Sequence, residues 1–285
     1  MTPREGQSGL ASRAREIEEL ADVYFFRPLG ALFARLAAAL GATPTQVTIF
    51  SMLIGVAGGA LLFDKRFALL GFALLIFYSV LDSTDGQLAR MTGQVTEFGR
   101  VLDGVGGYVV YVAIYIAITA GLLQRGHGLE IITWAALAAI SNTAQAQMYE
   151  YHRHHYATIV VKGRVVGDDP AKVSSASISG VYRWYLAMQR MFNGPHVEVE
   201  SAIAARAMND VVREQDREKY RKYFYGPVRG WNLLGDNTRF YAIGVAAGLH
   251  RIDLFFAFIL VPMNLALIAF WIWQRRADQR FLATI

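Results

Sequence analysis

The sequence predicts an all-α polytopic membrane protein with six transmembrane helices, an N-terminal amphipathic helix at the membrane surface and a helical cytoplasmic insertion. Three observations lead to this fold class. Hydrophobic residues make up 54% of the 285 residues, and the mean hydropathy is +0.28, which is too apolar for an ordinary soluble domain. The apolar residues gather in six segments close to the length of a membrane span. The basic residues are concentrated in alternate connections between those segments.

The N-terminal region, residues 1–46, is predicted to be cytoplasmic and interfacial. Apolar residues recur every three or four positions from Ile17 to Leu40, as they do along one face of a helix. Arginines flank or interrupt this pattern, and Pro28 is expected to kink or divide it. Such a helix suits the headgroup region better than a span, and an ordinary core helix is the alternative. Pro44 then ends this segment and begins the next helix.

Six apolar segments follow. They cover about 47–63, 67–81, 101–123, 131–149, 237–250 and 253–273. An even number of spans puts both termini on one side, and that side carries 24 of the 28 Lys and Arg residues, against four on the other. By the positive-inside rule, both termini are cytoplasmic. We therefore expect a multi-pass protein of the plasma (inner) membrane.

Residues 151–235 are predicted to form a polar cytoplasmic insertion. It separates transmembrane helices 1–4, within residues 47–150, from helices 5 and 6 and a cytoplasmic tail, within residues 236–285. Val181–Phe192 is typical of an amphipathic helix at a membrane surface, and Ile203–Tyr225 is typical of a solvated charged helix. Anionic membrane lipids account for the basic charge of this insertion, so we expect no nucleic-acid partner.

Three aspartates stand out between the second and third spans. Asp82 and Asp85 are three residues apart, which places both carboxylates on one helix face, and Asp103 begins the helix that returns from the same side. Like charges this close repel unless a cation lies among them, and oxygen ligands favour Mg²⁺, Mn²⁺ or Ca²⁺. Gly86 leaves room for a diphosphate, and Arg90 suits phosphate oxygens. The alternative is a solvated loop with ordinary acidic residues.

The spacing of this stretch is more specific than its composition. Seven of its residues match fixed positions of one signature, DxxDGxxARx8GxxxDxxxD. They are Asp82, Asp85, Gly86, Ala89, Arg90, Gly99 and Asp103. The stretch therefore resembles the CDP-alcohol phosphotransferase (CDP-alcohol phosphatidyltransferase) family. The resemblance extends to the six-span layout and the amphipathic N-terminal helix, but not to residues 151–235.

The resemblance implies a six-helix membrane enzyme, usually dimeric, that displaces CMP from a CDP-linked donor by attack of an alcohol. Carried over by position, it implies a Mg²⁺ or Mn²⁺ site and a CDP pocket. The metal ligands, which are also the catalytic residues, would be Asp82, Asp85 and Asp103. The residues that line the CDP pocket would be Gly86, Ala89, Arg90 and Gly99.

One position departs from the signature. Gly107 stands where the family has its last aspartate, the residue thought to contact a second metal ion and to deprotonate the acceptor hydroxyl. Glycine has no side chain for either role. Three explanations stay open: another group is the base, metal or solvent removes the proton, or the chain is a weak or inactive relative.

Three residues are candidates for the acceptor site. His152 follows the fourth span, and a histidine near its ordinary pKa can accept a proton. The histidines around it could instead bind a metal or form a polar helix end. Asp236 and Arg239 lie at the start of the fifth span, where Arg239 would hold an anionic acceptor or a lipid phosphate. Their alternative is an interfacial cap with a snorkelling arginine.

The leading functional hypothesis is a metal-dependent transferase of phospholipid synthesis. It moves a phosphatidyl group from a CDP-linked donor, in the first instance CDP-diacylglycerol, to an alcohol and releases CMP. One alternative is a soluble CDP-alcohol donor with a lipid acceptor, and a second is a non-catalytic CDP- or lipid-binding relative. A divalent-cation transporter is disfavoured because the other spans carry no matching acids. The partners expected are the donor, the alcohol, membrane lipids and a second copy of the chain.

Overall fold

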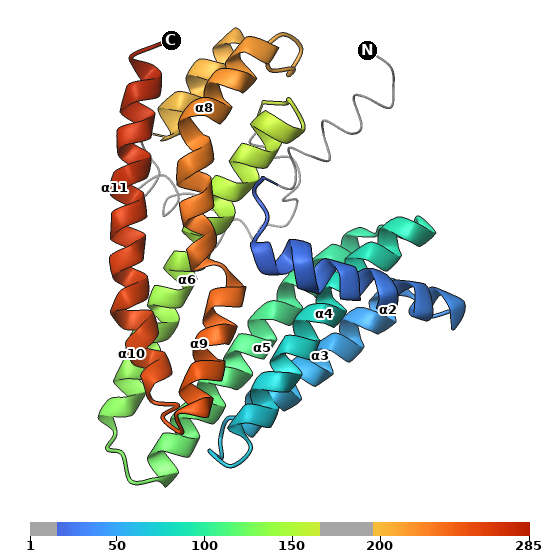
Figure 1. Cartoon of the computed structure of the whole chain (residues 1–285), viewed down its shortest axis with the longest axis vertical. Coiled ribbons are helices and arrows are strands. Elements are labelled where there is room, and N and C mark those ends of the chain that lie inside the picture. Colours follow the sequence, from blue (N-terminus) through green and yellow to red (C-terminus); the bar gives the residue numbers. More distant parts are fainter. Residues whose placement is uncertain (1–15, 166–195) are drawn as a thin grey trace, which may run out of the picture. The chain divides into compact units, whose positions relative to one another are not determined.

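The computed structural model describes residues 16–165 and 196–285 (Figure 1). These residues form helices and no β-strand, with two isolated β-bridges near residue 211. The described part divides into two compact units. We call residues 19–142 and 236–262 the aspartate unit. We call residues 16–18, 143–165, 196–235 and 263–285 the histidine unit. The predicted helix Val181–Phe192 lies outside the described residues.

The aspartate unit begins with two short helices. A π-helical turn, η1 (Asp22–Phe26), leads into α2 (Arg27–Ala39), and Pro28 stands in the first turn of α2, where its missing N–H costs little. Gly30 lets α2 approach α4 closely, since a Cβ there would lie 2.8 Å from the Ser83 Oγ atom. The amphipathic segment predicted from Ile17 to Leu40 is thus helical from residue 20, and it packs on the helix that carries Asp82 and Asp85.

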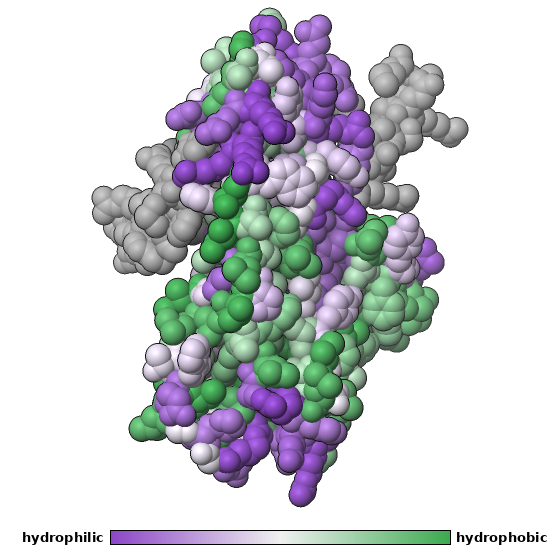
Figure 2. All heavy atoms as spheres, turned by 60° about the vertical axis from the view of Figure 1, so that its left-hand side comes forward, coloured by the Kyte–Doolittle hydropathy of each residue, from purple (hydrophilic) through white to green (hydrophobic). Residues whose placement is uncertain are grey.

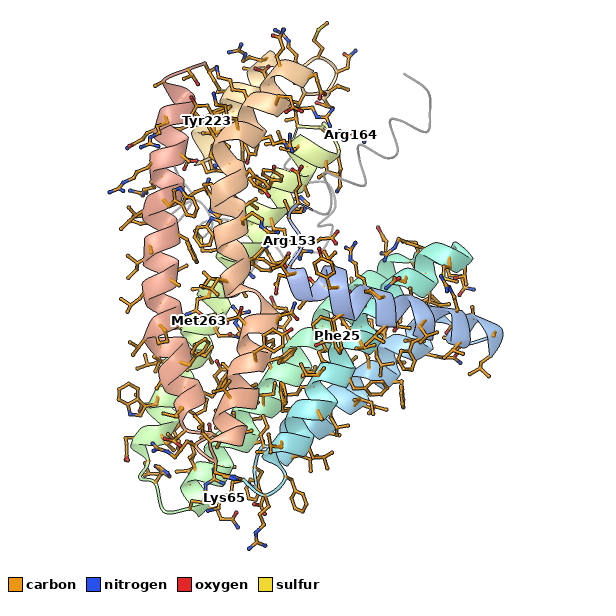
Figure 3. All side chains as sticks on the ribbon, in the orientation of Figure 1. Phe25, Lys65, Arg153, Arg164, Tyr223 and Met263 are labelled. Carbon is orange, nitrogen blue, oxygen red and sulfur yellow. The ribbon has the colours of Figure 1, made fainter. Side chains whose placement is uncertain are left out.

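Three long helices form the body of this unit. They are α3 (Pro44–Leu61), α4 (Ala68–Thr92) and α5 (Glu97–Gln124). Thr43 begins α3 with a capping box, in which its hydroxyl accepts from the Gln46 N–H and the Gln46 side chain accepts from the Thr43 N–H. Gly58 and Gly71 bring α3 and α4 together, because a Cβ on either would lie within 3 Å of the carbonyl oxygen of the other. Lys65, in the loop between these helices, marks one end of α4 (Figure 3).

The remaining helices of the aspartate unit are shorter. They are the first part of α6 (Glu130–Tyr156), α9 (Asp236–Gly248) and α10 (Leu254–Leu260). At Gly244, α9 lies so close to α4 that an added Cβ would meet the Phe72 ring at 2.7 Å. This contact packs α9, whose first turn carries Asp236 and Arg239, against α4.

The histidine unit packs around an aromatic core. Its helices are the second part of α6, η2 (Ala157–Val161), a helix over residues 196–206, α8 (Glu214–Trp231), η4 (Asn232–Leu234) and α11 (Pro262–Leu282). Tyr156, Tyr220, Phe224 and Phe281 are fully buried in one cluster. The core therefore joins segments that lie far apart in the sequence.

The prediction of a solvated charged helix from Ile203 to Tyr225 is wrong in two ways. The segment is broken at residues 207–213, and α8 then runs on to Trp231. One face of α8 is buried through Tyr220, Phe224, Val228 and Trp231. These residues recur every three or four positions, so the abundant charges of this helix conceal an apolar stripe.

Four segments of the described chain are long and apolar enough to cross a membrane: Pro44–Leu61, Ala68–Thr92, Glu97–Gln124 and Leu254–Leu282. Large apolar side chains are exposed on them, including Leu53, Val112 and Leu265, and Figure 2 shows hydrophobic surface of this kind. The predicted spans 131–149 and 237–250 lie in helices α6 and α9, but neither helix is both long enough and apolar enough to be counted with these four. Because α6 carries polar residues and α9 has 13 residues, six spans are not confirmed.

Candidate active site

A tight turn brings the functional ends of α4 and α5 together. Gly93 ends α4 in the left-handed conformation, with a φ of 70°, which glycine adopts without a steric cost. Thr96 caps α5, because its hydroxyl accepts a hydrogen bond from the Gly99 N–H at 3.0 Å. Asp82 and Asp85 lie in the second half of α4, and Asp103 lies in the second turn of α5.

The three carboxylates of this hairpin lie close together. Asp82 and Asp103 are within hydrogen-bonding reach of each other across the two helices. Asp85 is only 6% exposed, and the side chain of Thr48 on α3 lies against its carboxylate. Its Oδ2 atom is buried with no hydrogen-bond partner among the described residues. An unpaired buried carboxylate oxygen beside two further carboxylates suits an oxygen-binding divalent cation, which would offset their mutual repulsion.

A cleft of about 380 Å³ adjoins two of these carboxylates, those of Asp85 and Asp103. The four residues assigned to the CDP pocket by resemblance all line it: Gly86, Ala89, Arg90 and Gly99. Asp85, Asp103 and the turn residues at 94–96 complete one wall, and Thr48 belongs to the opposite helix. A Cβ at Gly86 would stand 3.5 Å from an Arg90 guanidinium nitrogen, so glycine leaves that cation open to the cleft. Thr96 and Gly99, at the start of α5, also line the cleft, and a helix N-terminus favours phosphate.

Gly107, the departure from the family signature, faces a tyrosine. A Cβ added at Gly107 would meet only the Tyr78 Oη atom within 4 Å, at 3.9 Å. Tyr78 lies one turn before Asp82 on α4 and is buried. Its hydroxyl is in electrostatic range of Asp82, Asp85, Asp103 and Asp236. The phenol hydroxyl is therefore the side-chain polar group nearest to the position that glycine leaves vacant.

Arg239 is a buried cation at the start of α9. It is 0% exposed, and its Nη1 atom donates to Asp236 Oδ1 at 2.7 Å. The Tyr111 hydroxyl on α5 donates to the same Asp236 oxygen at 2.9 Å. The Nε and Nη2 atoms of Arg239 have no hydrogen-bond partner among the described residues. Two free N–H groups on one side of a held guanidinium match the oxygens of a phosphate or carboxylate.

His152, the third acceptor-site candidate, lies in the histidine unit. Its ring stacks on Trp231 with centroids 4.8 Å apart, and its side chain is buried. Burial, helped by His196 and His155, holds the pKa of His152 well below its ordinary value. His152 is therefore a neutral, weakly basic group at neutral pH. The structure brings Asp82, Asp85, Asp103, Asp236 and Arg239 together in one unit and places His152 in the other.

The long apolar helices define a helical membrane protein, and the cleft with its carboxylates lies within them. Residues 42–205 match the family model described as CDP-alcohol phosphatidyltransferase. The chain belongs to this family. The match reaches past residue 151, so part of the segment expected to fall outside the resemblance lies within it. Enzymes of this family generally depend on a divalent metal ion.

Two curated relatives are similar over part of the chain. An archaetidylinositol phosphate synthase from Pyrococcus horikoshii is 36% identical over 88 residues, which cover 31% of this chain and 46% of the relative. A phosphatidylinositol phosphate synthase from Mycobacterium marinum is 39% identical over 64 residues, which cover 22% of this chain and 27% of the relative. The chain thus spans less than half the length of these relatives. No solved structure matches it.

Sequence reasoning missed two groups near the carboxylates. Tyr78 was counted only as part of an apolar segment, and Thr48 only as part of the first predicted span. A tyrosine four residues before Asp82, on the same helix face, was the available signal for Tyr78. No local signal marked Thr48, since its place beside Asp85 depends on how α3 packs on α4.

Proposed function

We propose that the protein is a Mg²⁺- or Mn²⁺-dependent transferase of phospholipid synthesis. It moves a phosphatidyl group from CDP-diacylglycerol to an alcohol hydroxyl and releases CMP. One observation carries the proposal: a group of three carboxylates has a buried unpaired oxygen on Asp85, and two of its members line a cleft together with Gly86 and Arg90. This combination suits a diphosphate bound beside a divalent cation.

The side chains have separate parts in this reaction. Asp82, Asp85 and Asp103 would hold the ion, which when bound would offset charge on the diphosphate oxygens. Arg90 and the start of α5 would bind phosphate oxygens of CDP. The acceptor oxygen attacks the phosphorus that carries diacylglycerol, a new P–O bond forms, and the P–O bond of the anhydride breaks. CMP leaves with the bridging oxygen, and the acceptor proton passes to a base.

Tyr78 is the proposed replacement for the missing aspartate side chain. With its hydroxyl 3.9 Å from a Cβ position at Gly107, it is suited to hydrogen-bond the acceptor hydroxyl. A phenol is a poor base beside several carboxylates, because they disfavour its anionic form. We therefore assign Tyr78 to orienting the acceptor and assign proton removal to an aspartate of the cluster or to water.

Arg239 is the proposed acceptor anchor, and Asp236 and Tyr111 hold it in place. The two relatives are named as an archaetidylinositol phosphate synthase and a phosphatidylinositol phosphate synthase. A phosphorylated polyol would pair with the two free N–H groups of Arg239. This extends the general alcohol acceptor to a phosphorylated one.

The proposed topology puts both termini and the cleft on the cytoplasmic side of the plasma (inner) membrane, in a homodimer. It rests on the excess of Lys and Arg, 24 against four, and on the family resemblance. A protease-sensitive tag inserted in residues 151–235 should be protected in right-side-out cells. Cleavage of that tag would mean that the topology is the reverse of the one proposed.

The experiment that tests the function is product analysis by mass spectrometry. Purified protein is given Mg²⁺ or Mn²⁺ with CDP-diacylglycerol and a pool of polyols and polyol phosphates, or CDP-choline with diacylglycerol. We expect a phosphatidylated polyol phosphate from the first mixture. Product from the second mixture alone would reverse the donor and acceptor. No lipid product from any mixture, despite CDP binding, would favour a non-catalytic relative, as the glycine at position 107 would allow.

A further inference from the structure

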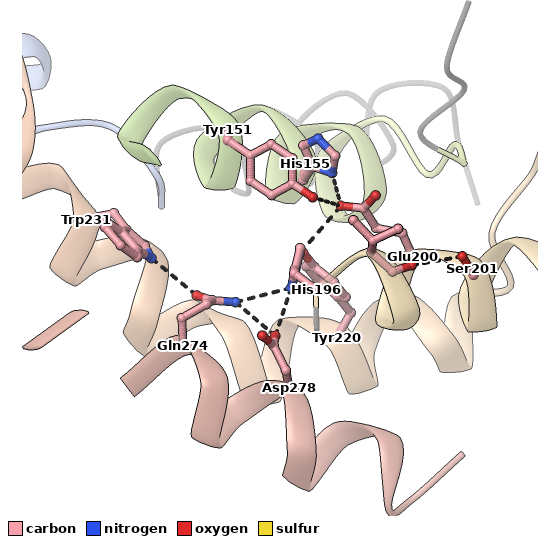
Figure 4. A network of polar contacts seen from close by, with 10 residues as sticks. Tyr151, His155, His196, Glu200, Ser201, Tyr220, Trp231, Gln274 and Asp278 are labelled. Atoms are coloured by element: carbon pink, nitrogen blue, oxygen red, sulfur yellow. Dashed lines mark hydrogen bonds and ion pairs between the residues drawn. The ribbon is translucent and has the colours of Figure 1, made fainter. Parts of the chain in front are cut away.

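The histidine unit contains a second cluster of metal-binding groups, unrelated to the family signature. His155 comes from α6, and His196 and Glu200 come from the helix over residues 196–206. One nitrogen of each histidine and one oxygen of Glu200 lie within 4.8 Å of one another. Figure 4 shows these side chains converging from two helices. Both histidines are buried.

His196 is oriented as metal-bound histidines are. Its Nδ1 atom lies 2.8 Å from Asp278 Oδ1 on α11, and the Asp278 side chain is almost fully buried. Gln274 donates to the same aspartate oxygen at 3.2 Å, and Trp231 in turn donates to Gln274 at 3.2 Å. A proton on Nδ1, shared with Asp278, leaves Nε2 as an acceptor, which lies 3.0 Å from the Tyr220 hydroxyl and 3.8 Å from Glu200 Oε1. A carboxylate behind the distant nitrogen fixes the tautomer of a ligating histidine in this way.

His155 and Glu200 supply the other two donors. The Nδ1 atom of His155 is in contact with Glu200 Oε1, but this contact does not have the geometry of a hydrogen bond. Tyr151 donates to the same oxygen at 2.8 Å. One nitrogen of His155 and one oxygen of Glu200 thus lie side by side, within 4.8 Å of a nitrogen of His196.

We propose that His155, His196 and Glu200 bind a late first-row divalent ion of the Zn²⁺ type. Imidazole nitrogen favours zinc and its neighbours over Mg²⁺, which prefers oxygen alone. Two histidines and one glutamate form a three-ligand zinc set and leave a fourth position. The Tyr220 hydroxyl, 3.0 Å from His196 Nε2, borders that position. The ion would therefore be distinct in kind from the one proposed at the aspartates.

The alternative is a closed hydrogen-bond network with a protonated histidine between two carboxylates. It accounts for Asp278, Gln274 and Trp231 as well as the metal site does. The contact between His155 and Glu200 fits either arrangement. A bound ion would also have a clear structural effect. It would tie α6 to the helix over residues 196–206 and, through Asp278, to α11.

The test measures metal bound to the full chain. Protein purified in detergent is stripped with a chelator, reloaded with Zn²⁺, freed of excess ion and analysed for zinc per chain. The Asp82→Asn background removes ion held at the aspartates. We expect one zinc per chain, bound at least about tenfold more weakly after His155→Gln or Glu200→Gln. His154→Gln and Glu198→Gln are matched controls, since both side chains are exposed on the same two helices, and they should retain the zinc.

A second measurement needs no variant in the cluster. Co²⁺ bound by two imidazoles and a carboxylate should give the visible absorption of a four-coordinate site, whereas Co²⁺ held by oxygen ligands alone absorbs weakly. The proposal is overturned if the reloaded chain holds no stoichiometric zinc and Co²⁺ shows no such absorption. Zinc retention by His155→Gln and Glu200→Gln equal to that of the controls would also overturn it. Neither result bears on the proposed transferase function, which depends on the other unit.

Discussion

The two candidate metal sites differ in donor chemistry and in what surrounds them. The aspartate cluster offers only oxygen donors, adjoins a cleft and leaves the Oδ2 atom of Asp85 unpaired. The histidine cluster offers nitrogen and oxygen donors, and behind His196 the buried Asp278 accepts hydrogen bonds from His196 and Gln274. An open oxygen site suits an ion shared with a phosphate substrate, whereas an enclosed mixed site suits an ion that stays in place. Buried charge alone therefore does not identify the reactive centre.

The largest effect is expected from loss of an aspartate. Asp82→Asn or Asp103→Asn should weaken metal-dependent CDP binding by about 100-fold or more. Mutation of residues that only hydrogen-bond to a metal ligand already lowers metal affinity by about 10–100-fold. Equilibrium binding of CDP with and without Mg²⁺ measures this. Asp64→Asn, in the α3–α4 loop, makes the same charge change away from the cleft and should have no effect. Unchanged binding in both aspartate variants would remove the metal assignment.

Arg239 should give the next largest effect. Arg239→Gln removes a buried cation. This should weaken the binding of the acceptor by about 2 kcal/mol or more, which is roughly 30-fold in affinity. We expect this loss as a higher KM for the acceptor, with CDP binding unchanged. Arg251→Gln is the control, because Arg251 is exposed and paired with Asp253. A higher KM for the CDP donor instead would assign Arg239 to the donor.

Tyr78→Phe should have a smaller effect. Loss of one hydrogen bond to the acceptor corresponds to about 1 kcal/mol, or roughly fivefold in kcat. Steady-state kinetics with a saturating donor measure it, and Tyr24→Phe, at a position 78% exposed, serves as the control. A change in thermal stability without a change in kcat would limit Tyr78 to packing.

Gly107→Asp should give the smallest change. The position has room for a side chain, so turnover with a simple alcohol should rise, by less than about fivefold. A fully aligned general base raises a rate by about 10²–10⁴, and an added carboxylate without that alignment supplies only a small part of this. Gly104→Asp adds the same charge one turn earlier, where a Cβ meets nothing within 4 Å, and should not raise turnover. A fall in turnover at Gly107→Asp would mean that the acceptor occupies this space.

The two sites were not equally accessible to sequence reasoning. The aspartates lie in one helical hairpin, so the helical spacing of Asp82 and Asp85 and the return of the third span from the same side predict that they meet. The histidine cluster joins residues 155, 196, 200 and 278, and no local spacing links them. His155 was noticed only because it belongs to a run of histidines. His196, Glu200 and Asp278 were missed, because only tertiary packing assembles them.

The helical fold class was predictable, but two of its details were not. Thr43 and Pro44 mark the start of α3 through capping chemistry that is local to the sequence. The buried face of α8 was missed because its charged residues outnumber the four that form the apolar stripe. The complete burial of Arg239 was also not predicted, because it depends on contacts that its position in the sequence does not show. A lone arginine near a helix start resembles a snorkelling residue until Asp236 and Tyr111 are seen to hold it.

The most direct test of the metal-dependent transferase function is CMP release from CDP-diacylglycerol by the purified chain, with and without Mg²⁺ or Mn²⁺, in the presence of polyol phosphates. We expect metal-dependent release that Asp64→Asn retains and Asp82→Asn loses. CDP binding without CMP release from any donor would contradict it, and so would release that persists unchanged in Asp82→Asn.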